Sequence, residues 1–199
     1  MEFKEIVMQR YATKKFDGKK IDQKKLDELL ELIRFSASSL NLQPWKIKII
    51  MDPKTKEKLS PATWNQEQIN SCSHLLVFCA DKDLDGKAKL LEKTMIKNGA
   101  KKEQLKGYMD MIHNAINNMN PEQQLSWTQR QLYLAVGNAI NGAKTLGFDS
   151  CPMEGFNAVE YSKILKLPDN LVPTTLVPIG YAADTPRPKV RLAKEDVFF

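Results

Sequence analysis

The feature that most constrains the fold is a continuous apolar run in the middle of the chain, His74–Ala80. A run of β character without alternation of polar and apolar residues is typical of a strand that is buried on both faces of a sheet. A second strand is predicted over Trp45–Met51, where apolar and polar residues alternate until Asp-Pro ends the run. A third is predicted over Leu171–Ile179. The chain therefore builds a sheet around one central strand.

Helices are expected in most of the remaining chain. Asp22 suits the N-cap of an amphipathic helix over 23–36. Pro121 suits the first turn of a long helix that runs to about Leu146, with Gly147 just beyond its end. Elements in this mixed order indicate an α+β fold, with a central mixed or antiparallel sheet flanked by helices, as one domain over residues 1–199. Further helices are expected over 2–11, near 54–60 and, as a pair broken near Asn98-Gly99, over 86–119, before an extended tail over 181–199.

Composition excludes several classes of protein. With 199 residues and 42% hydrophobic content, the chain suits a globular domain. It has no apolar run of membrane-spanning length and its first residues lack a signal core, so a cytoplasmic protein without a membrane partner is expected. The net charge of +6 is scattered among acids, and no nucleic-acid-binding pattern occurs. The three cysteines and two histidines show no metal-ligand spacing, so no metal site is expected.

Four short blocks carry residues suited to binding chemistry: Arg10–Asp17, Ser38–Trp45, Pro152–Phe156 and Lys189–Arg191. The second block is Ser-Ser-Leu-Asn-Leu-Gln-Pro-Trp at a helix-to-strand turn, and its hydroxyls and amides suit a polar, planar ligand. Taken alone, an ordinary turn explains the second and third blocks equally well, and Arg10, Lys14, Lys189 and Arg191 are each explained by an ordinary surface cation. No Gly-x-Gly-x-x-Gly follows a strand, which disfavours a Rossmann dinucleotide site.

Taken together and in this order, the four blocks resemble the nitroreductase family, the FMN-dependent NAD(P)H oxidoreductases. The small oxygen-insensitive bacterial branch, which includes nitroreductases and dihydropteridine reductases, is the most similar. Its blocks are Arg-x-Ser-x-Lys, Ser-x-x-Asn-x-Gln-Pro-Trp, Pro-x-Glu-Gly-Phe and a basic Lys-x-Arg near the end of the chain. The resemblance extends from residue 2 to about residue 192.

The resemblance implies FMN as the cofactor and assigns residues to it. Arg10, Lys189 and Arg191 are expected to hold the phosphate, since a guanidinium matches phosphate oxygens in two-point contact. Lys14 is expected at the N1/O2 edge of the flavin, where negative charge appears on reduction. A backbone N–H of Glu154 or Gly155 is expected at flavin N5, so no side chain is assigned as catalytic. The complete implied cofactor-binding set is Arg10, Tyr11, Ala12, Lys14, Ala37, Ser38, Ser39, Asn41, Asn65, Gln68, Pro152, Met153, Glu154, Gly155, Lys189 and Arg191.

Two positions depart from the family pattern. Ala12 stands where the family usually has a serine, so one polar contact to the cofactor is missing or supplied by another group. Gln68 stands where the small bacterial enzymes often carry a lysine, which removes a positive charge near the pyrimidine ring. Both departures bear on the affinity and the reduction potential of the flavin.

The resemblance also implies an intertwined homodimer, in which Ser38, Ser39 and Asn41 reach the flavin of the partner subunit. The tail over about 182–199 is expected to wrap the partner, and the small-residue face of the helix over 122–146 offers a surface for a symmetry mate. The implied reaction takes hydride from NAD(P)H onto flavin N5 and passes two electrons to a small acceptor, such as a nitroaromatic or a quinone. Alternatives are an enone, pteridine, flavin or dehalogenating reductase on the same scaffold, or a non-catalytic flavin-binding or redox-sensing module.

Overall fold

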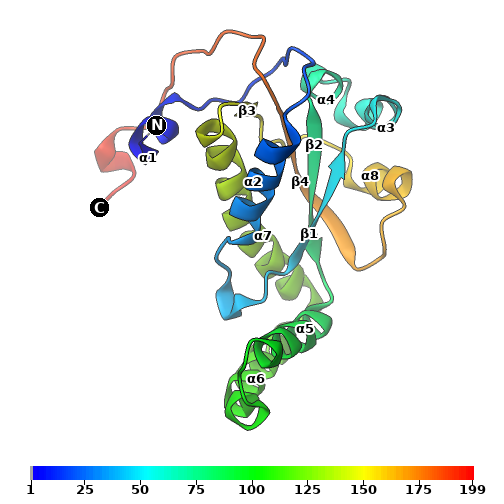
Figure 1. Cartoon of the computed structure of the whole chain (residues 1–199), viewed down its shortest axis with the longest axis vertical. Helices are drawn as coiled ribbons and strands as arrows, with labels where there is room; N and C mark the ends of the chain where they lie inside the picture. The colour runs from blue at the N-terminus through cyan, green and yellow to red at the C-terminus, as the bar shows by residue number, and fades with distance from the viewer. Residues whose placement is uncertain (1) are drawn as a thin grey trace.

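The computed structural model describes residues 2–199, and its centre is a four-stranded sheet in the order β1-β2-β4-β3 (Figure 1). Each neighbouring pair of these strands is antiparallel, and within the described residues a parallel pairing occurs only as the isolated bridge between Ala12 and Ser150. The predicted α+β fold is confirmed, with the antiparallel form of the sheet. The strands are β1 (Trp45–Ile50), β2 (His74–Asp81), β3 (Asp149–Ser150) and β4 (Leu171–Gly180).

The predicted helices are present, and two short ones were not predicted. Asp22 caps α2 by accepting from the Lys24 amide, and Asn120 with Gln123 forms a capping box at the start of α7. Within residues 2–199, no helix is long and apolar enough to cross a membrane. The helices are α1 (Phe3–Gln9), α2 (Gln23–Arg34), α3 (Pro53–Leu59), α4 (Glu67–Ser71), α5 (Leu84–Lys97), α6 (Lys102–Asn117), α7 (Pro121–Thr145) and α8 (Ala158–Leu165).

The two faces of β2 explain its continuous apolar run. Leu76 and Phe78 join the core that α2 and α7 complete on one face of the sheet. Leu75 and Val77 join a second core, which α3, α4 and α8 complete on the other face. Every residue of β2 is buried, because successive side chains point to opposite faces and both faces are covered (Figure 1).

The helices α5 and α6 form an arm that projects beyond the end of the sheet (Figure 1). A buried ion pair holds its base, where Lys87 Nζ lies 3.4 Å from Asp81 Oδ2 and donates to the Trp45 carbonyl at 3.0 Å. Asn170 Nδ2 donates to the other oxygen of Asp81 at 2.6 Å. The arm is thus joined to β1, to β2 and to the residue before β4 by one buried polar network.

His74, at the start of β2, makes stability depend on pH. Burial lowers its pKa, and Lys56 and Lys20 lower it further. Below the ordinary histidine pKa of about 6.5, the unfolded chain binds a proton at His74 more readily than the folded chain does. The free energy of unfolding is therefore highest above this pH and falls as the pH drops below it. We expect the loss of unfolding free energy between pH 7.5 and 5.5 to be smaller in His74→Gln, measured by urea titration. An equal loss in both proteins would contradict this role.

Candidate functional site

The segment after α1 pairs with the start of the chain's C-terminal tail. Asp17 N donates to the Tyr181 carbonyl at 2.9 Å, and Ala183 N donates to the Lys15 carbonyl at 2.8 Å. These bonds continue the edge of the sheet, since Phe16 forms an isolated antiparallel bridge with Ala182. The tail is thereby carried across the segment that holds Arg10 to Lys14.

Asp184 fixes this junction with both carboxylate oxygens. Its Oδ1 accepts from the Tyr11 hydroxyl and its Oδ2 accepts from the Lys14 amide, each at 2.8 Å. Burial raises the pKa of Tyr11 to about 12, and the bond to Asp184 adds to the effect, so the phenol remains a donor. A pocket of about 390 Å³ opens beside the junction, lined by Tyr11, Ala12, Lys14, Asp184, Thr185 and Arg187.

Three cations, Arg10, Lys189 and Arg191, lie close enough to one another to repel, and Arg10 and Lys189 are one and two residues from the pocket residues Tyr11 and Arg187. Arg10 is half-buried, and burial followed by the charge of Arg191 lowers its pKa. Desolvation lowers the pKa of Lys189, and the charges of Arg10 and Arg191 lower it further. Lys189 Nζ donates only to the Val7 carbonyl, at 2.7 Å. Across the described chain, none of Arg10, Lys14, Lys189 and Arg191 has a carboxylate oxygen within 4.0 Å.

The Pro152–Gly155 loop lies beside Lys14, whose Nζ contacts Cys151 Sγ at 3.6 Å. Met153 exchanges two backbone hydrogen bonds with Leu176 of β4, and its sulfur lies 3.5 Å from Gln68 Nε2. The loop therefore joins Lys14 to Gln68. In residues 2–199, the amide N–H groups of Glu154 and Gly155 donate to no protein acceptor, although both residues are exposed.

Residues 64–66 pack against the Pro152–Gly155 loop. Gln66 Nε2 donates to the Gly155 carbonyl at 3.1 Å, and a Cβ on Gly155 would lie 3.4 Å from the ring of Trp64. Trp64 and Asn65 both have left-handed backbone, with φ of 53° and 56°. Asparagine tolerates this conformation well, whereas tryptophan rarely adopts it. The predicted Asn65 is thus held close to the predicted Gly155.

Ser38, Ser39 and Asn41 lie apart from this group in the same chain. The Ser39 amide donates to Gln131 of α7 at 2.8 Å, whereas Tyr133, two residues further along α7, contacts Glu154. Side chains two positions apart point to opposite sides of a helix. Ala37 belongs to the same loop, so the structure brings the predicted residues together in two groups on either side of α7.

Sequence reasoning missed three contributors to the site: Asp184, Arg187 and Gln66. They lie outside the four blocks, in a proline-bearing tail and a polar loop, so no spacing singled them out. The pairing of Asp17 with Tyr181 is a long-range contact that local patterns do not encode.

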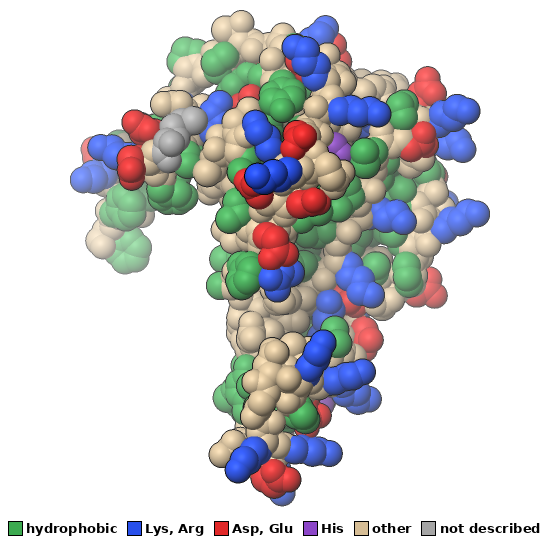
Figure 2. Space-filling model, in the orientation of Figure 1, with side chains coloured by type: hydrophobic (Ala, Val, Ile, Leu, Met, Phe, Trp, Pro, Cys, Tyr) green, Lys and Arg blue, Asp and Glu red, His purple; other side chains and the backbone are tan. Residues whose placement is uncertain are grey.

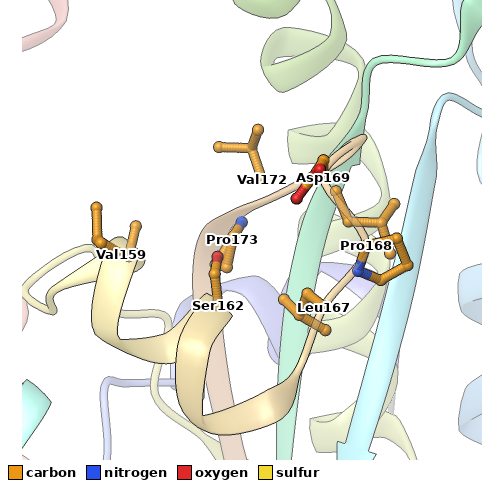
Figure 3. A pocket seen from close by; sticks show the side chains of 9 residues that line it. Val159, Ser162, Leu167, Pro168, Asp169, Val172 and Pro173 are labelled. Atoms are coloured by element: carbon orange, nitrogen blue, oxygen red, sulfur yellow. The ribbon is translucent and has the colours of Figure 1, made fainter.

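A separate groove of about 240 Å³ lies between α8 and the start of β4 (Figure 3). Val159, Leu167, Pro168 and Pro173 give it an apolar lining, and Asp169 is its one charged residue. It shares no residue with the pocket at Lys14 and offers no cation for a phosphate.

Comparisons with known proteins identify the family and the fold. A family model described as "Nitroreductase family" matches residues 7–181. A Staphylococcus haemolyticus protein named "Putative NAD(P)H nitroreductase SH0546" is 35% identical over 94% of this chain and 92% of its own length. A Staphylococcus epidermidis structure described as a "putative NAD(P)H:FMN oxidoreductase" has a TM-score of 0.92 and 26% identity, covering 100% of this chain and 95% of its own.

A third relative shows how widely the fold is used. The structure of CLA-ER, described as an enone reductase of gut-bacterial fatty acid saturation metabolism, has a TM-score of 0.89 with 22% identity, covering 100% of this chain and 97% of its own. At that identity the likeness concerns the fold alone. The family match over most of the chain, with relatives above 30% identity along nearly its full length, shows that this protein belongs to the nitroreductase family.

Proposed function

We propose that this protein is an FMN-dependent oxidoreductase that takes hydride from NADH or NADPH and passes two electrons to a nitroaromatic, a quinone or a similar conjugated acceptor. The observation that carries the proposal is a set of cations without a carboxylate partner: Lys14 lines the pocket, and Arg10, Lys189 and Arg191 lie close enough to repel one another. Like charges that repel one another are a cost to the folded state unless an anion binds among them.

The donors present fit FMN. Arg10, Lys189 and Arg191 would hold the phosphate through charge-assisted hydrogen bonds, and Lys14 would place a positive charge at the flavin edge. The unpaired amides of Glu154 and Gly155 would donate to N5, and the missing side chain of Gly155 lets a flat ring approach. FMN, when bound, supplies the hydride and electron chemistry, while the chain supplies orientation and electrostatics.

The departures from the family pattern leave the cofactor fewer contacts. Ala12 lines the pocket without a polar side chain, and Gln68 is directed to Met153 and Gln66 by its amide. The relatives named as NAD(P)H nitroreductase and NAD(P)H:FMN oxidoreductase support the choice of cofactor and donor. They do not select the acceptor, and an enone, pteridine, flavin or dehalogenating reductase uses the same donors.

The decisive experiment is the absorption spectrum of the purified protein, followed by NADH and NADPH oxidation against a panel of acceptors. A flavin spectrum with turnover of nitroaromatics or quinones supports the proposal. A flavin spectrum without turnover of any acceptor indicates the flavin-binding or redox-sensing alternative. A protein that neither carries nor binds FMN contradicts both.

Lys14→Ala is expected to make the bound flavin harder to reduce. The ammonium stabilises negative charge that develops on the ring, and Gln68 supplies no second cation to compensate. Spectroelectrochemistry of both proteins measures the midpoint potential. An equal or higher potential in Lys14→Ala would contradict the placement of Lys14 at the flavin edge.

We further propose that the complete site needs a homodimer. Large apolar side chains project from α1, the end of α2 and the tail, including Phe3, Met8, Phe35 and Phe198, each more than 60% exposed. Figure 2 shows hydrophobic side chains along the projecting chain end. The small-residue face of α7 does not supply this surface, because Leu132, Ala135 and the neighbouring residues on that face pack in the chain's own core. A partner that covers α1 and the tail would bring its Ser38, Ser39 and Asn41 group to this pocket.

The dimer is tested by its mass in solution. We expect sedimentation at micromolar concentration to give twice the 22.7 kDa of one chain. The interface of such an obligate dimer is expected to be largely apolar and to bury more than about 2,000 Å². Dilution should release FMN and destabilise the fold together, since neither half of the site is complete alone. A monomer that still binds FMN would contradict the shared site.

A further inference from the structure

A directed chain of hydrogen bonds ends on the side chain of Glu154. Thr175 Oγ1, buried in β4, donates to the Tyr133 hydroxyl at 2.8 Å. The Tyr133 hydroxyl in turn donates to Glu154 Oε1. The order follows from proton count, because a phenol has one proton and the carboxylate has none to give.

Tyr133 remains a donor over the working pH range. Burial raises its pKa, and the bond to Glu154 adds to the rise while Thr175 opposes it. Among the described residues, Glu154 has no other side-chain partner. Without Tyr133, the exposed carboxylate would be free to rotate toward the pocket that holds Lys14.

With these hydrogen bonds, the Pro152–Gly155 loop is held at three points. Met153 is paired to Leu176 of β4 at 2.8 and 2.9 Å, and Gln66 holds the Gly155 carbonyl. The Glu154 side chain is the third tie, and it connects the loop to α7. The Met153 carbonyl lies in the peptide plane of the Glu154 amide, and the Phe156 amide donates at 2.9 Å to the Glu154 carbonyl, which lies in the plane of the Gly155 amide. With the side-chain bonds of Glu154 and Gln66, these contacts hold the direction of the two unpaired amides.

We propose that Tyr133 is a positioning residue: through Glu154 it holds the amides of Glu154 and Gly155 toward the electron-transferring atom of the cofactor, with Thr175 orienting its hydroxyl. The inference rests on the proposed function, since it assigns those amides to flavin N5. By holding the Glu154 carboxylate against α7, Tyr133 also keeps this negative charge away from the flavin ring, which gains negative charge on reduction.

The test uses the dimeric holoprotein with FMN labelled with a heavy nitrogen isotope at N5. We expect the N5 resonance in Tyr133→Phe to move toward that of a flavin whose N5 accepts no hydrogen bond, because the bond from the amides weakens. Flavin reduction by NAD(P)H should slow about tenfold, since small misplacements of reacting groups cost up to roughly a hundredfold. FMN affinity should stay within twofold, since the phosphate contacts are untouched.

Matched variants separate positioning from general damage. Glu154→Gln, whose amide oxygen still accepts from Tyr133, should keep the N5 resonance close to wild type, whereas Glu154→Ala should match Tyr133→Phe. The double variant Tyr133→Phe/Glu154→Ala should be no worse than either single one, because both remove the same bond. Tyr181→Phe is the control, since the Tyr181 hydroxyl makes no hydrogen bond within residues 2–199.

The outcomes distinguish the two proposals. If wild type binds FMN but Tyr133→Phe leaves the N5 resonance unchanged, the positioning role is wrong and the proposed function stands. If wild type binds no FMN, both are wrong. Should Tyr133→Phe fail to fold, Thr175→Val removes only the donor into Tyr133 and must move the N5 resonance in the same direction by a smaller amount.

Discussion

Lys87→Met is expected to lower the free energy of unfolding by about 3 kcal/mol or more, the cost of leaving a buried charge without its partner. The side chains of Lys87 and Asp81 are 14% and 3% exposed, so water cannot replace the lost ammonium. The Trp45 carbonyl loses its donor as well. The remaining bonds to Asp81, from Asn170 at 2.6 Å and the Asp83 amide at 3.2 Å, place the loss toward the lower end of the usual range.

Urea unfolding of two further variants identifies the buried charge as the cause. Lys87→Met/Asp81→Asn leaves no buried charge, so it should be more stable than Lys87→Met although it carries more changes. Lys163→Met removes an exposed partner of Glu160 and should cost less than about 0.5 kcal/mol. If Lys87→Met and Lys163→Met unfold at the same urea concentration, the network does not anchor the arm.

The core of this fold could be predicted because its signals are local. The short length and β character of the apolar run in β2 favour a buried strand over a helix, and the capped, periodic pattern of α7 predicts a helix with one apolar face. The α8 helix was missed because it is short and buries one side chain, Tyr161, fully. Its N-cap, Asn157, accepts from two amides, and an asparagine before Ala-Val-Glu was the signal available.

Site residues that belong to a short sequence motif could be predicted, whereas residues that reach the site only through long-range contacts could not. The basic residues and the Pro152–Gly155 loop were assigned from the family resemblance, and in the structure Lys14 lines the pocket and contacts Cys151, the residue before that loop. Asp184 and Tyr133 act only through contacts with residues far away in the sequence, Tyr11 and Glu154. A hydrogen bond across such a separation depends on the packing of whole elements, so no local pattern announces it.

Arg191→Ala is expected to weaken FMN binding about tenfold to a hundredfold, because one charge-assisted bond to phosphate contributes roughly 1.5–3 kcal/mol. Arg10→Ala should fall at the upper end, since Arg10 is half-buried and its bonds would be better shielded from water. Flavin fluorescence titration measures both affinities. Arg130→Ala is the matched control, because Arg130, exposed on α7, forms a hydrogen bond only with Ser126 among residues 2–199.

The same substitution should act in the opposite direction on the cofactor-free protein. Arg191 lowers the pKa of Arg10, which means that the two charges repel each other in the folded chain. Removing Arg191 relieves that repulsion, so apo Arg191→Ala should unfold at the same urea concentration as apo wild type or at a higher one. A cluster of cations that binds an anion lowers the stability of the protein while the anion is absent. Removing one of the cations restores that stability but weakens binding of the anion. If Arg191→Ala destabilises the apo protein while FMN affinity is unchanged, the cluster is a structural feature and not a phosphate site.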